Sequence, residues 1–470
     1  MRQSTGRTLL GLLPLIFISL FIGIAPFGDA FVTSFFHDAY GAKEFAGVDN
    51  YRFLFSDKGF SYSLSITILW AVLNSFLSIF LGFIFAVAMA TRFKRLSSVF
   101  YAVLLIPWGI PVYIAVPLWR AIIHGNGGTS LLTRFFGISI NLMMQPVASF
   151  ISVLAVSLWM MVPLTTFVLY GALRKTPKSV TDAAHIEGAK PVDLAFSIYL
   201  PGMWHSLLVM GLLNFIKALK EFTVVFLMTS GGPPLVSGIT EHHIIGATTT
   251  LGVLIYELFS ETDDLGLTSS YAMVMTAIVA IIMVFWLLVR RKEKTTDTRI
   301  ILFAALTQPL FFMPWGLVWA GCYLVTLRYK KLYPAVLAAE IIHFAVLLFT
   351  KSFLAALHPG VITALIALFF LREKTMQRGA KVFSRAPRFK TYRTKVPLWN
   401  IVTDLLVIAM VLSSFLVLFM LVWMSLSGVS TTYVDSLIPP YFSVSSFIAI
   451  VKDERIFTYF LNTFIVAGFT

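Results

Sequence analysis

Three polar residues interrupt an apolar run and are the first candidates for chemistry in this sequence. Lys217 and Glu221 stand four positions apart, so both side chains would share one helical face, and Asn214 lies one turn before Lys217. A charged side chain within a membrane span is costly and usually serves a function. We predict a functional role for these residues, whose donors and acceptors suit a hydroxylated solute in a wet cavity. The alternative is a neutralising pair that packs helices or reaches the interface.

Metal and nucleotide chemistry find less support. Glu340 and His343 share a helical face, but Glu-x-x-His ligates metals when two facing helices each supply it, and it occurs once. Glu241, His242 and His243 suit a surface cluster better than a metal site. The sequence contains no glycine-rich loop ending in Gly-Lys-Ser/Thr that would cradle phosphates. We predict no metal site, no bound cofactor and no enzymatic activity in this chain.

The composition is typical of a membrane protein. Of the 470 residues, 58% are hydrophobic and only 12% are charged, which soluble domains do not show. Several apolar runs reach the roughly 20 residues that cross about 30 Å of hydrocarbon. The formal charge of +14 resides in short basic segments beside these runs, as the positive-inside rule requires, so nucleic acid is excluded as a partner. The predicted fold class is all-α, a polytopic bundle of transmembrane helices.

Six spans are predicted before residue 295. They cover residues 9–36, 64–90, 98–122, 146–173, 204–228 and 270–289. Basic clusters follow the second, fourth and sixth spans, which places those three loops in the cytoplasm. The segment 241–264 carries acidic residues and no Lys or Arg, so we interpret it as an exterior loop.

The segment Ser179–Pro201 has the pattern of two short helices joined by a sharp turn. Ser179 with Asp182 three residues on predicts a capping box. Gly188 predicts a helix stop, because glycine turns left-handed without a Cβ clash. Pro191 suits the first turn of the second helix.

Small residues on this segment carry a family resemblance. Ala183 and Ala184 leave one helix face nearly bare, so the backbone of a partner can approach closely. The segment resembles the Glu-Ala-Ala loop of binding-protein-dependent ABC importer permeases, with Asp in place of the usual Glu. The matching residues are Asp182, Ala183, Ala184, Glu187, Gly188, Ala189, Leu200 and Pro201. The resemblance implies the type I ABC importer permease fold, with this loop in the cytoplasm and inserted into a groove on an ATPase subunit.

Other pieces before residue 294 resemble the sugar-uptake branch of these permeases, the type of the maltose transporter's larger subunit. They are residues 47–51, Pro107-Trp108 with Pro111, Trp119, Asn214-Phe215 with Phe222, residues 229–233, and residues 248–250 with Tyr256. In this family the fifth span helps to line the solute pathway, so the resemblance implies that Asn214, Lys217 and Glu221 line it.

The chain divides into three predicted parts. Residues 1–295 form a first permease half, residues 296–398 an extra hydrophobic module with a basic cytoplasmic linker, and residues 399–470 the start of a second permease half. The third part is inferred from an internal repeat, whose members are Phe60, Tyr62 and Leu64 in one copy and Phe457, Tyr459 and Leu461 in the other. We interpret the sequence as two fused permease halves, the second truncated.

The resulting functional prediction is the membrane-spanning permease of an ATP-driven ABC importer in the cell (plasma or inner) membrane. The resemblance implies two cytoplasmic ABC ATPase subunits that bind the ATP, an extracytoplasmic solute-binding protein, membrane lipids and a small-molecule solute, a carbohydrate in the first place. One alternative is an ABC permease for glycerol phosphate, polyamine or an ion. Others are an ATP-independent secondary transporter or channel, and a membrane enzyme built on Glu340 and His343.

Overall fold

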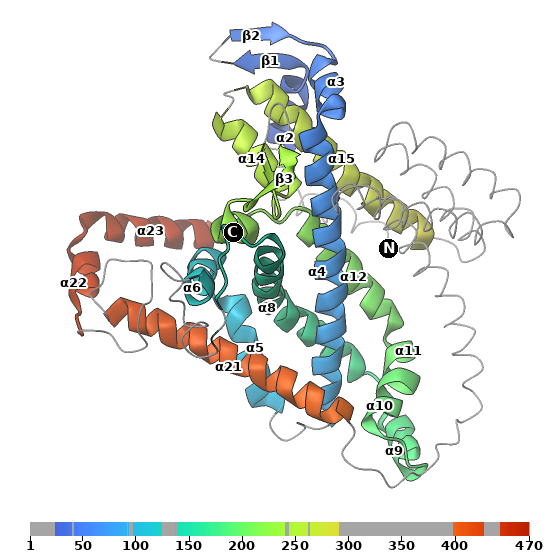
Figure 1. Ribbon diagram of the computed structural model, residues 1–470. Helices are drawn as coiled ribbons and strands as arrows, with labels where there is room; N and C mark the ends of the chain where they lie inside the picture. Colours follow the sequence, from blue (N-terminus) through green and yellow to red (C-terminus); the bar gives the residue numbers. More distant parts are fainter. Residues whose placement is uncertain are drawn as a thin grey trace, which may run out of the picture. The chain divides into compact units, whose positions relative to one another are not determined.

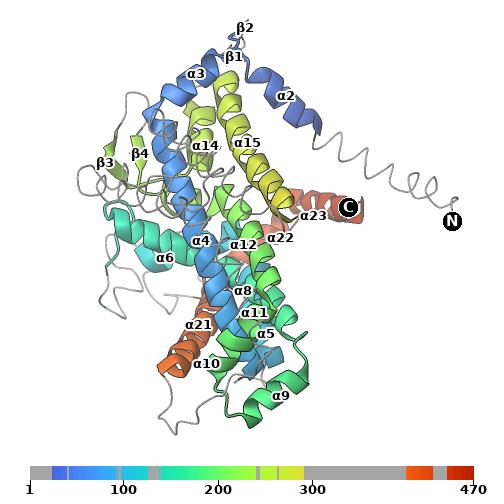
Figure 2. The same ribbon diagram turned by 90° about the vertical axis from the view of Figure 1, so that its right-hand side faces the viewer.

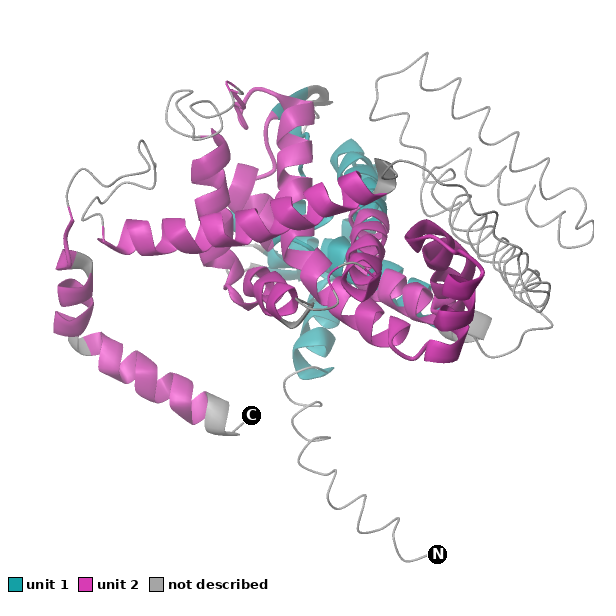
Figure 3. Cartoon of the chain, turned by 90° about the horizontal axis from the view of Figure 1, so that it is seen from below, with its two compact units in different colours: residues 1–73, 215–222, 234–382 teal, residues 74–214, 223–233, 383–470 magenta. Residues whose placement is uncertain are grey.

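The computed structural model describes residues 24–39, 42–91, 93, 97–124, 137, 139–239, 244–261, 264–290, 398–426 and 442–469. The chain forms two compact units (Figure 3). Unit 1 comprises residues 1–73, 215–222 and 234–382, and unit 2 comprises residues 74–214, 223–233 and 383–470. The predicted extra module lies outside the described residues apart from residue 398. Glu340, His343 and residues 241–243 also lie outside them.

Helices dominate the described residues, as the all-α prediction requires (Figure 1). Unit 1 holds α2 (Ala25–Thr33), α3 (Asp49–Ser56), α14 (Leu251–Glu261) and α15 (Leu265–Arg290). It also holds two antiparallel hairpins, β1 (Phe36–Ala39) with β2 (Ala42–Phe45) and β3 (Pro234–Ile239) with β4 (Ile244–Gly246). Unit 2 holds α5 (Ser97–Gly109), α6 (Val112–His124), α8 (Pro146–Leu173), α9 (Lys178–Ile186), α10 (Pro191–Asp193), η2 (Leu194–Tyr199), α11 (Leu200–Gly202), α13 (Thr223–Thr229), α21 (Leu398–Leu426), α22 (Ser445–Lys452) and α23 (Glu454–Phe469). Helices α4 (Lys58–Thr91) and α12 (Trp204–Leu219) run from one unit into the other.

Four described helices, α4, α8, α15 and α21, are long and apolar enough to cross a membrane. Two bent pairs meet the same criterion when taken together, α5 with α6 and residues 191–202 with α12, which raises the number among the described residues to six. The predicted spans 64–90, 146–173 and 270–289 are confirmed as helices, and α8 begins and ends where the sequence predicts. The predicted first span is wrong at its end, because α2 stops at Thr33 and the chain enters β1 at Phe36.

The predicted third span, 98–122, is wrong as a single helix. Helix α5 ends at Gly109 and α6 begins at Val112, and their axes are bent by 96°. Pro111 lies between them, where its missing N–H and its ring prevent a continuous helix. Pro107 is accommodated inside α5.

In unit 1, the 47–51 motif joins α2, α3 and the β1–β2 hairpin. Gly47 turns the chain at φ +57°. The buried Asn50 amide donates to the carbonyl oxygens of Ser34 at 3.0 Å and Phe36 at 2.8 Å. The Tyr51 and Ser34 hydroxyls are 2.7 Å apart. The motif is therefore a structural joint.

The segment 241–264, predicted as an exterior loop, is partly wrong as a loop because it contains α14. This helix packs against α15, which also contacts α2, α3 and β1. The Tyr271 hydroxyl of α15 donates to the Asp57 carboxylate at 2.9 Å. The acidic residues therefore lie partly on a helix that packs against α15.

In unit 2, α21 packs beside α5 and α6 (Figure 2). Val417, Met420 and Trp423 of α21 are buried in a cluster with α6 and with Trp159 of α8. The Trp159 indole N–H donates to the Ser413 hydroxyl at 3.0 Å. Helix α21 therefore shares a core with α5, α6 and α8.

Helices α22 and α23 repeat the local structure of α3 and the start of α4. Both α3 and α22 have 8 residues, and each ends at an extended aspartate, Asp57 or Asp453. Each carboxylate accepts a hydrogen bond from the backbone N–H two positions later, Gly59 at 2.9 Å and Arg455 at 3.0 Å. This geometry pairs Asp57 with Asp453. The aromatic residues of the predicted repeat lie one position away from this pairing.

Candidate functional site: the elbow of residues 178–202

The elbow, which we define as residues 178–202, contains α9, α10, η2 and α11 (Figure 1). Its first helix begins differently from the prediction. Pro177 occupies the N-cap without a side-chain hydrogen bond, and Ser179 lies inside α9. The predicted capping box of Ser179 with Asp182 is therefore wrong, because Pro177 occupies the N-cap two residues earlier and the helix starts at Lys178.

The end of α9 is a Schellman turn, as the glycine predicts. Gly188 adopts φ +85°. Its N–H donates to the His185 carbonyl at 3.0 Å, and the Ala189 N–H donates to the Ala184 carbonyl at 2.9 Å. These are the two hydrogen bonds that define the motif, and the left-handed residue between them favours glycine. The turn reverses the chain within three residues.

A short, irregular helix then connects the turn to α12. Pro191 starts α10, and the Lys190 N–H donates to the Asp193 carboxylate at 2.9 Å. Residues Leu194–Tyr199 form a π-helix in which the Leu200 N–H donates to the Ala195 carbonyl. Pro201, which has no N–H, follows in α11. The 76° bend between this segment and α12 completes the elbow.

One side of the elbow is anchored in the core of unit 2. Ala184 and Ala189 are buried with Leu194, Ala195 and Tyr199 of the elbow. The same cluster contains Phe83, Ala86 and Val87 of α4, Leu169 and Leu173 of α8, and Met203, Leu207 and Met210 near or within α12. Since close-packed interiors transmit displacement, a movement of α9 must be passed to these three helices.

The opposite side of the elbow is exposed. Asp182, Ala183 and Glu187 lie on it, and the Ile186 side chain is 88% exposed. The predicted bare face of Ala183 and Ala184 is therefore wrong for Ala184, because that methyl group packs inward. The exposed face combines an apolar side chain with two carboxylates and suits a protein partner. Leu200 and Pro201 are partly buried where the elbow joins α12.

A polar junction, which sequence reasoning missed, joins α4, α8 and α12 in unit 2. The Asn214 amide, 6% exposed, donates to the hydroxyls of Ser78 at 2.7 Å and Thr165 at 3.0 Å. Asn74 donates to Ser157 at 2.7 Å. The sequence feature that could have predicted this junction is the spacing of Asn74, Ser78 and Gly82, which places them along one face of α4. Within the described contacts, Asn214 connects helices, and its place in a solute pathway stays a prediction.

The two charged pathway candidates do not share a helical face. Helix α12 ends at Leu219, so the predicted i,i+4 relation of Lys217 and Glu221 is wrong. The Glu221 N–H donates to the Ala218 carbonyl at 3.2 Å, an i to i−3 bond typical of a helix end. Lys217 is exposed and Glu221 is half-buried. The α12–α13 break therefore exposes a cation at the helix end and does not present a membrane-buried pair.

Comparison with known proteins defines the class of this chain. Residues 78–295 match the family described as the binding-protein-dependent transport system inner membrane component. The matched region contains the elbow, the Asn214, Ser78 and Thr165 contact of the polar junction, and four of the spanning helices or bent pairs. Over these residues the chain is similar to that family, and its apolar helices are those of a multi-pass membrane protein.

Individual relatives narrow the comparison. The chain is 28% identical to the trehalose/maltose transport system permease protein MalF of Thermococcus litoralis, over 60% of this chain and 92% of that protein. It is 28% identical to the sn-glycerol-3-phosphate transport system permease protein UgpA of Shigella flexneri, over 58% of this chain and 89% of that protein. Its fold resembles a chain of a bacterial ABC transporter involved in alginate import, with a TM-score of 0.52 and 15% identity over 62% of this chain and 98% of that chain.

Proposed function

We propose that this chain is the membrane-spanning permease of an ATP-driven ABC importer in the cell membrane. Two cytoplasmic ATPase subunits would bind the ATP, and the elbow would contact one of them. The observation that supports this proposal is that one side of the elbow is exposed and the other is buried in the core of unit 2. Ile186, Asp182 and Glu187 are available to a partner, whereas Ala184 and Ala189 are fixed in the core that contains α4, α8 and α12.

This arrangement suits the transmission of force. A flexible loop would absorb a push from an ATPase by changing its own conformation. The Schellman turn, the Lys190–Asp193 hydrogen bond and the buried alanines restrict that freedom. A displacement at Ile186 is then passed to the three helices behind it, which is what switching a pathway between two faces of a membrane requires.

For the solute we infer a carbohydrate delivered by an extracytoplasmic binding protein. The MalF relative is named for trehalose and maltose, and the alginate transporter of similar fold was crystallised with a pentasaccharide-bound periplasmic protein. Glycerol phosphate is the second candidate, because the UgpA relative covers nearly the same length of this chain. Uptake assays with both classes of solute separate them.

We also infer that residues 399–470 begin a second permease half fused to the first. The repeated geometry supports this inference, since α3–Asp57–α4 and α22–Asp453–α23 share helix length, backbone conformation and carboxylate hydrogen bond. Residues 1–295 would form the first half and residues 296–398 the connection. A transporter of this kind would need one polypeptide where separate subunits are otherwise paired.

Replacing Ile186 tests the coupling role directly. Ile186→Asp puts an unpaired charge into the contact, and the loss of a central apolar anchor commonly costs about 2 kcal/mol or more of binding free energy, roughly 30-fold in affinity. We expect ATP-driven uptake to fall by at least that factor while the amount of inserted protein stays unchanged. Ile186→Leu serves as the matched control and should retain uptake. Normal uptake by Ile186→Asp would overturn the coupling role.

The orientation of the elbow is tested on the same protein. Cys322 is the only cysteine, so Cys322→Ser provides a background for single labels. Ala183→Cys in that background should resist a membrane-impermeant maleimide in intact cells and react in inside-out vesicles. Ser56→Cys, at an exposed position of α3, should show the reverse pattern. Labelling of Ala183→Cys from outside would place the elbow out of reach of any cytoplasmic ATPase.

A further inference from the structure

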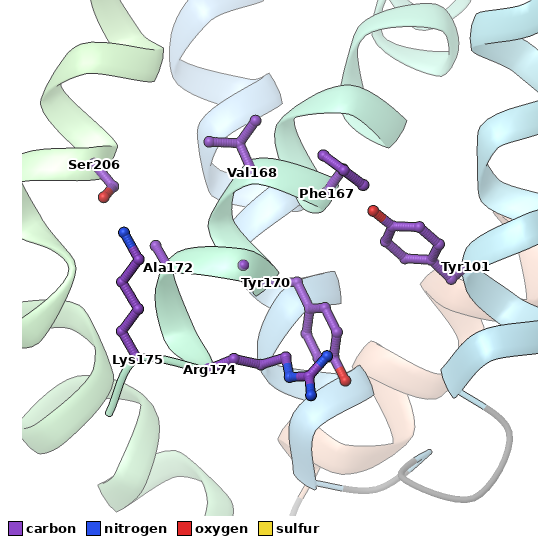
Figure 4. Close-up of a pocket in the computed structure, with 9 residues that line it drawn as sticks. Tyr101, Phe167, Val168, Tyr170, Ala172, Arg174, Lys175 and Ser206 are labelled. Carbon is purple, nitrogen blue, oxygen red and sulfur yellow. The ribbon is translucent and has the colours of Figure 1, made fainter. Parts of the chain in front are cut away.

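A hollow of about 710 Å³ lies around the end of α8 in unit 2 (Figure 4). Its aromatic part is made by Tyr101 of α5 with Phe167 and Tyr170 of α8, whose ring centroids lie 5.1 Å and 6.4 Å from that of Tyr101. Gly171 also lines the hollow, and a Cβ built there meets no atom within 4 Å. The hollow therefore has room along an apolar wall.

Two cations mark the end of this hollow. Arg174 and Lys175 directly follow α8 and are exposed. Figure 4 shows Arg174 beside Tyr170 and Lys175 directed toward Ser206. Among the described residues, neither cation forms an ion pair with a carboxylate. A pair of uncompensated cations at the C-terminal end of a span attracts a negative charge from outside the protein.

The place of Arg174 and Lys175 in the sequence indicates their depth in the membrane. Helix α8 is a candidate span that ends at Leu173, and the polar elbow starts at Lys178. Arg174 and Lys175 lie between them, where a span meets water. Tyrosine rings are enriched at the same depth, because their bodies are apolar and their hydroxyl groups are polar.

We propose that this hollow binds an anionic phospholipid of the cytoplasmic leaflet. The headgroup phosphate would lie between Arg174 and Lys175, and an acyl chain would run over Tyr101, Phe167 and Gly171. Basic pockets between spanning helices bind anionic headgroups in this way. The leaflet follows from the orientation in the proposed function, whereas the choice of an anionic lipid follows from the charges alone.

The test measures lipid binding to the full chain without any ATPase. Delipidated protein in neutral detergent is titrated with phosphatidylglycerol or phosphatidylcholine, and retained lipid is counted by native mass spectrometry. A cation near the headgroups contributes about 1 kcal/mol, so Arg174→Gln with Lys175→Gln should weaken phosphatidylglycerol binding about 30-fold. Gly171→Leu should also weaken phosphatidylglycerol binding, because the leucine side chain would occupy the space beside Gly171. Lys178→Gln, three positions beyond Lys175, is the matched control and should bind as wild type.

Several results would overturn the proposal. Equal retention of the two lipids would remove the role of charge, and an equal effect of Lys178→Gln would reduce it to general attraction. Unchanged binding by Gly171→Leu would contradict an acyl chain in the hollow. Competition by inorganic phosphate with no preference for the lipid would indicate a phosphate site. Failure of the Ile186 experiment would leave all of these measurements unaffected, so the two proposals fail separately.

Discussion

The turn at Gly188 offers the sharpest test of why the elbow is stiff. Its φ of +85° costs an L-residue roughly 1–2 kcal/mol, and a β-branched residue up to about 3 kcal/mol. The two hydrogen bonds of the turn contribute about 0.5–1.5 kcal/mol each. Because strain and stabilisation are of similar size, Gly188→Ala should open the turn in a large fraction of molecules, and Gly188→Val in most. Gly188→Asn should open it least, since asparagine tolerates this conformation.

Hydrogen exchange of the full chain in detergent measures the opening. The amides of residues 188 and 189 are the donors of the turn, so their protection should fall about 5- to 30-fold in Gly188→Ala. Coupled uptake should fall in the same order, from Gly through Asn and Ala to Val. Gly202→Ala is the matched control within the elbow, because a Cβ there meets nothing within 4 Å and its φ is not left-handed.

Two outcomes would refute this reasoning. Unchanged amide protection in Gly188→Val would mean that the turn is held by something other than glycine's conformational freedom. An equal loss in Gly202→Ala would mean that the elbow tolerates no substitution, whatever its backbone conformation. If amide protection fell and uptake did not, the role of glycine in the turn would be correct, but the transmission of force by the elbow would not depend on the turn.

Two further predictions separate packing from transport at the end of α12. Asn214→Ala should lower the free energy of unfolding by about 1–3 kcal/mol, because Ser78 and Thr165 lose their donor. Leu213→Ala, which changes a neighbouring exposed side chain, should leave the free energy of unfolding unchanged. Thermal unfolding in detergent measures both variants. Lys217→Gln should change the free energy of unfolding by less than about 0.5 kcal/mol, because the side chain is exposed, and should lower solute uptake if Lys217 lines the pathway. Full uptake by Lys217→Gln would remove that residue from the pathway.

The sequence predicted those features that depend on a single residue type or on a long average. Apolar length alone located α8 to the residue, and Gly188 with Pro191 predicted the turn and the second helix. Features that depend on a contact between distant segments were not accessible. The inward orientation of Ala184, for example, depends on its packing with α4 and α12.

Competing local signals explain the remaining errors. Ser179 is a good capping residue, but Pro177 starts the helix first. Lys217 and Glu221 have helical spacing, but the helix ends between them at Leu219. In the repeat, which stays a prediction, the aromatic residues match one position away from the pairing of Asp57 with Asp453.

The pair Ala183–Ala184 shows why small residues recur at this point. Adjacent positions on a helix point about 100° apart, so one methyl group can face the core while the other faces a partner. Ala184 packs with Leu169 and Leu173, and a larger side chain there would force α9 away from α8. Ala184→Arg would therefore disturb the anchor of the elbow, and a loss of uptake would say little about docking. Ala183→Arg changes only the exposed surface. If uptake fails in Ala183→Arg while the amide protection of residues 188 and 189 is intact, the substitution has disrupted the contact with the ATPase and not the structure of the elbow.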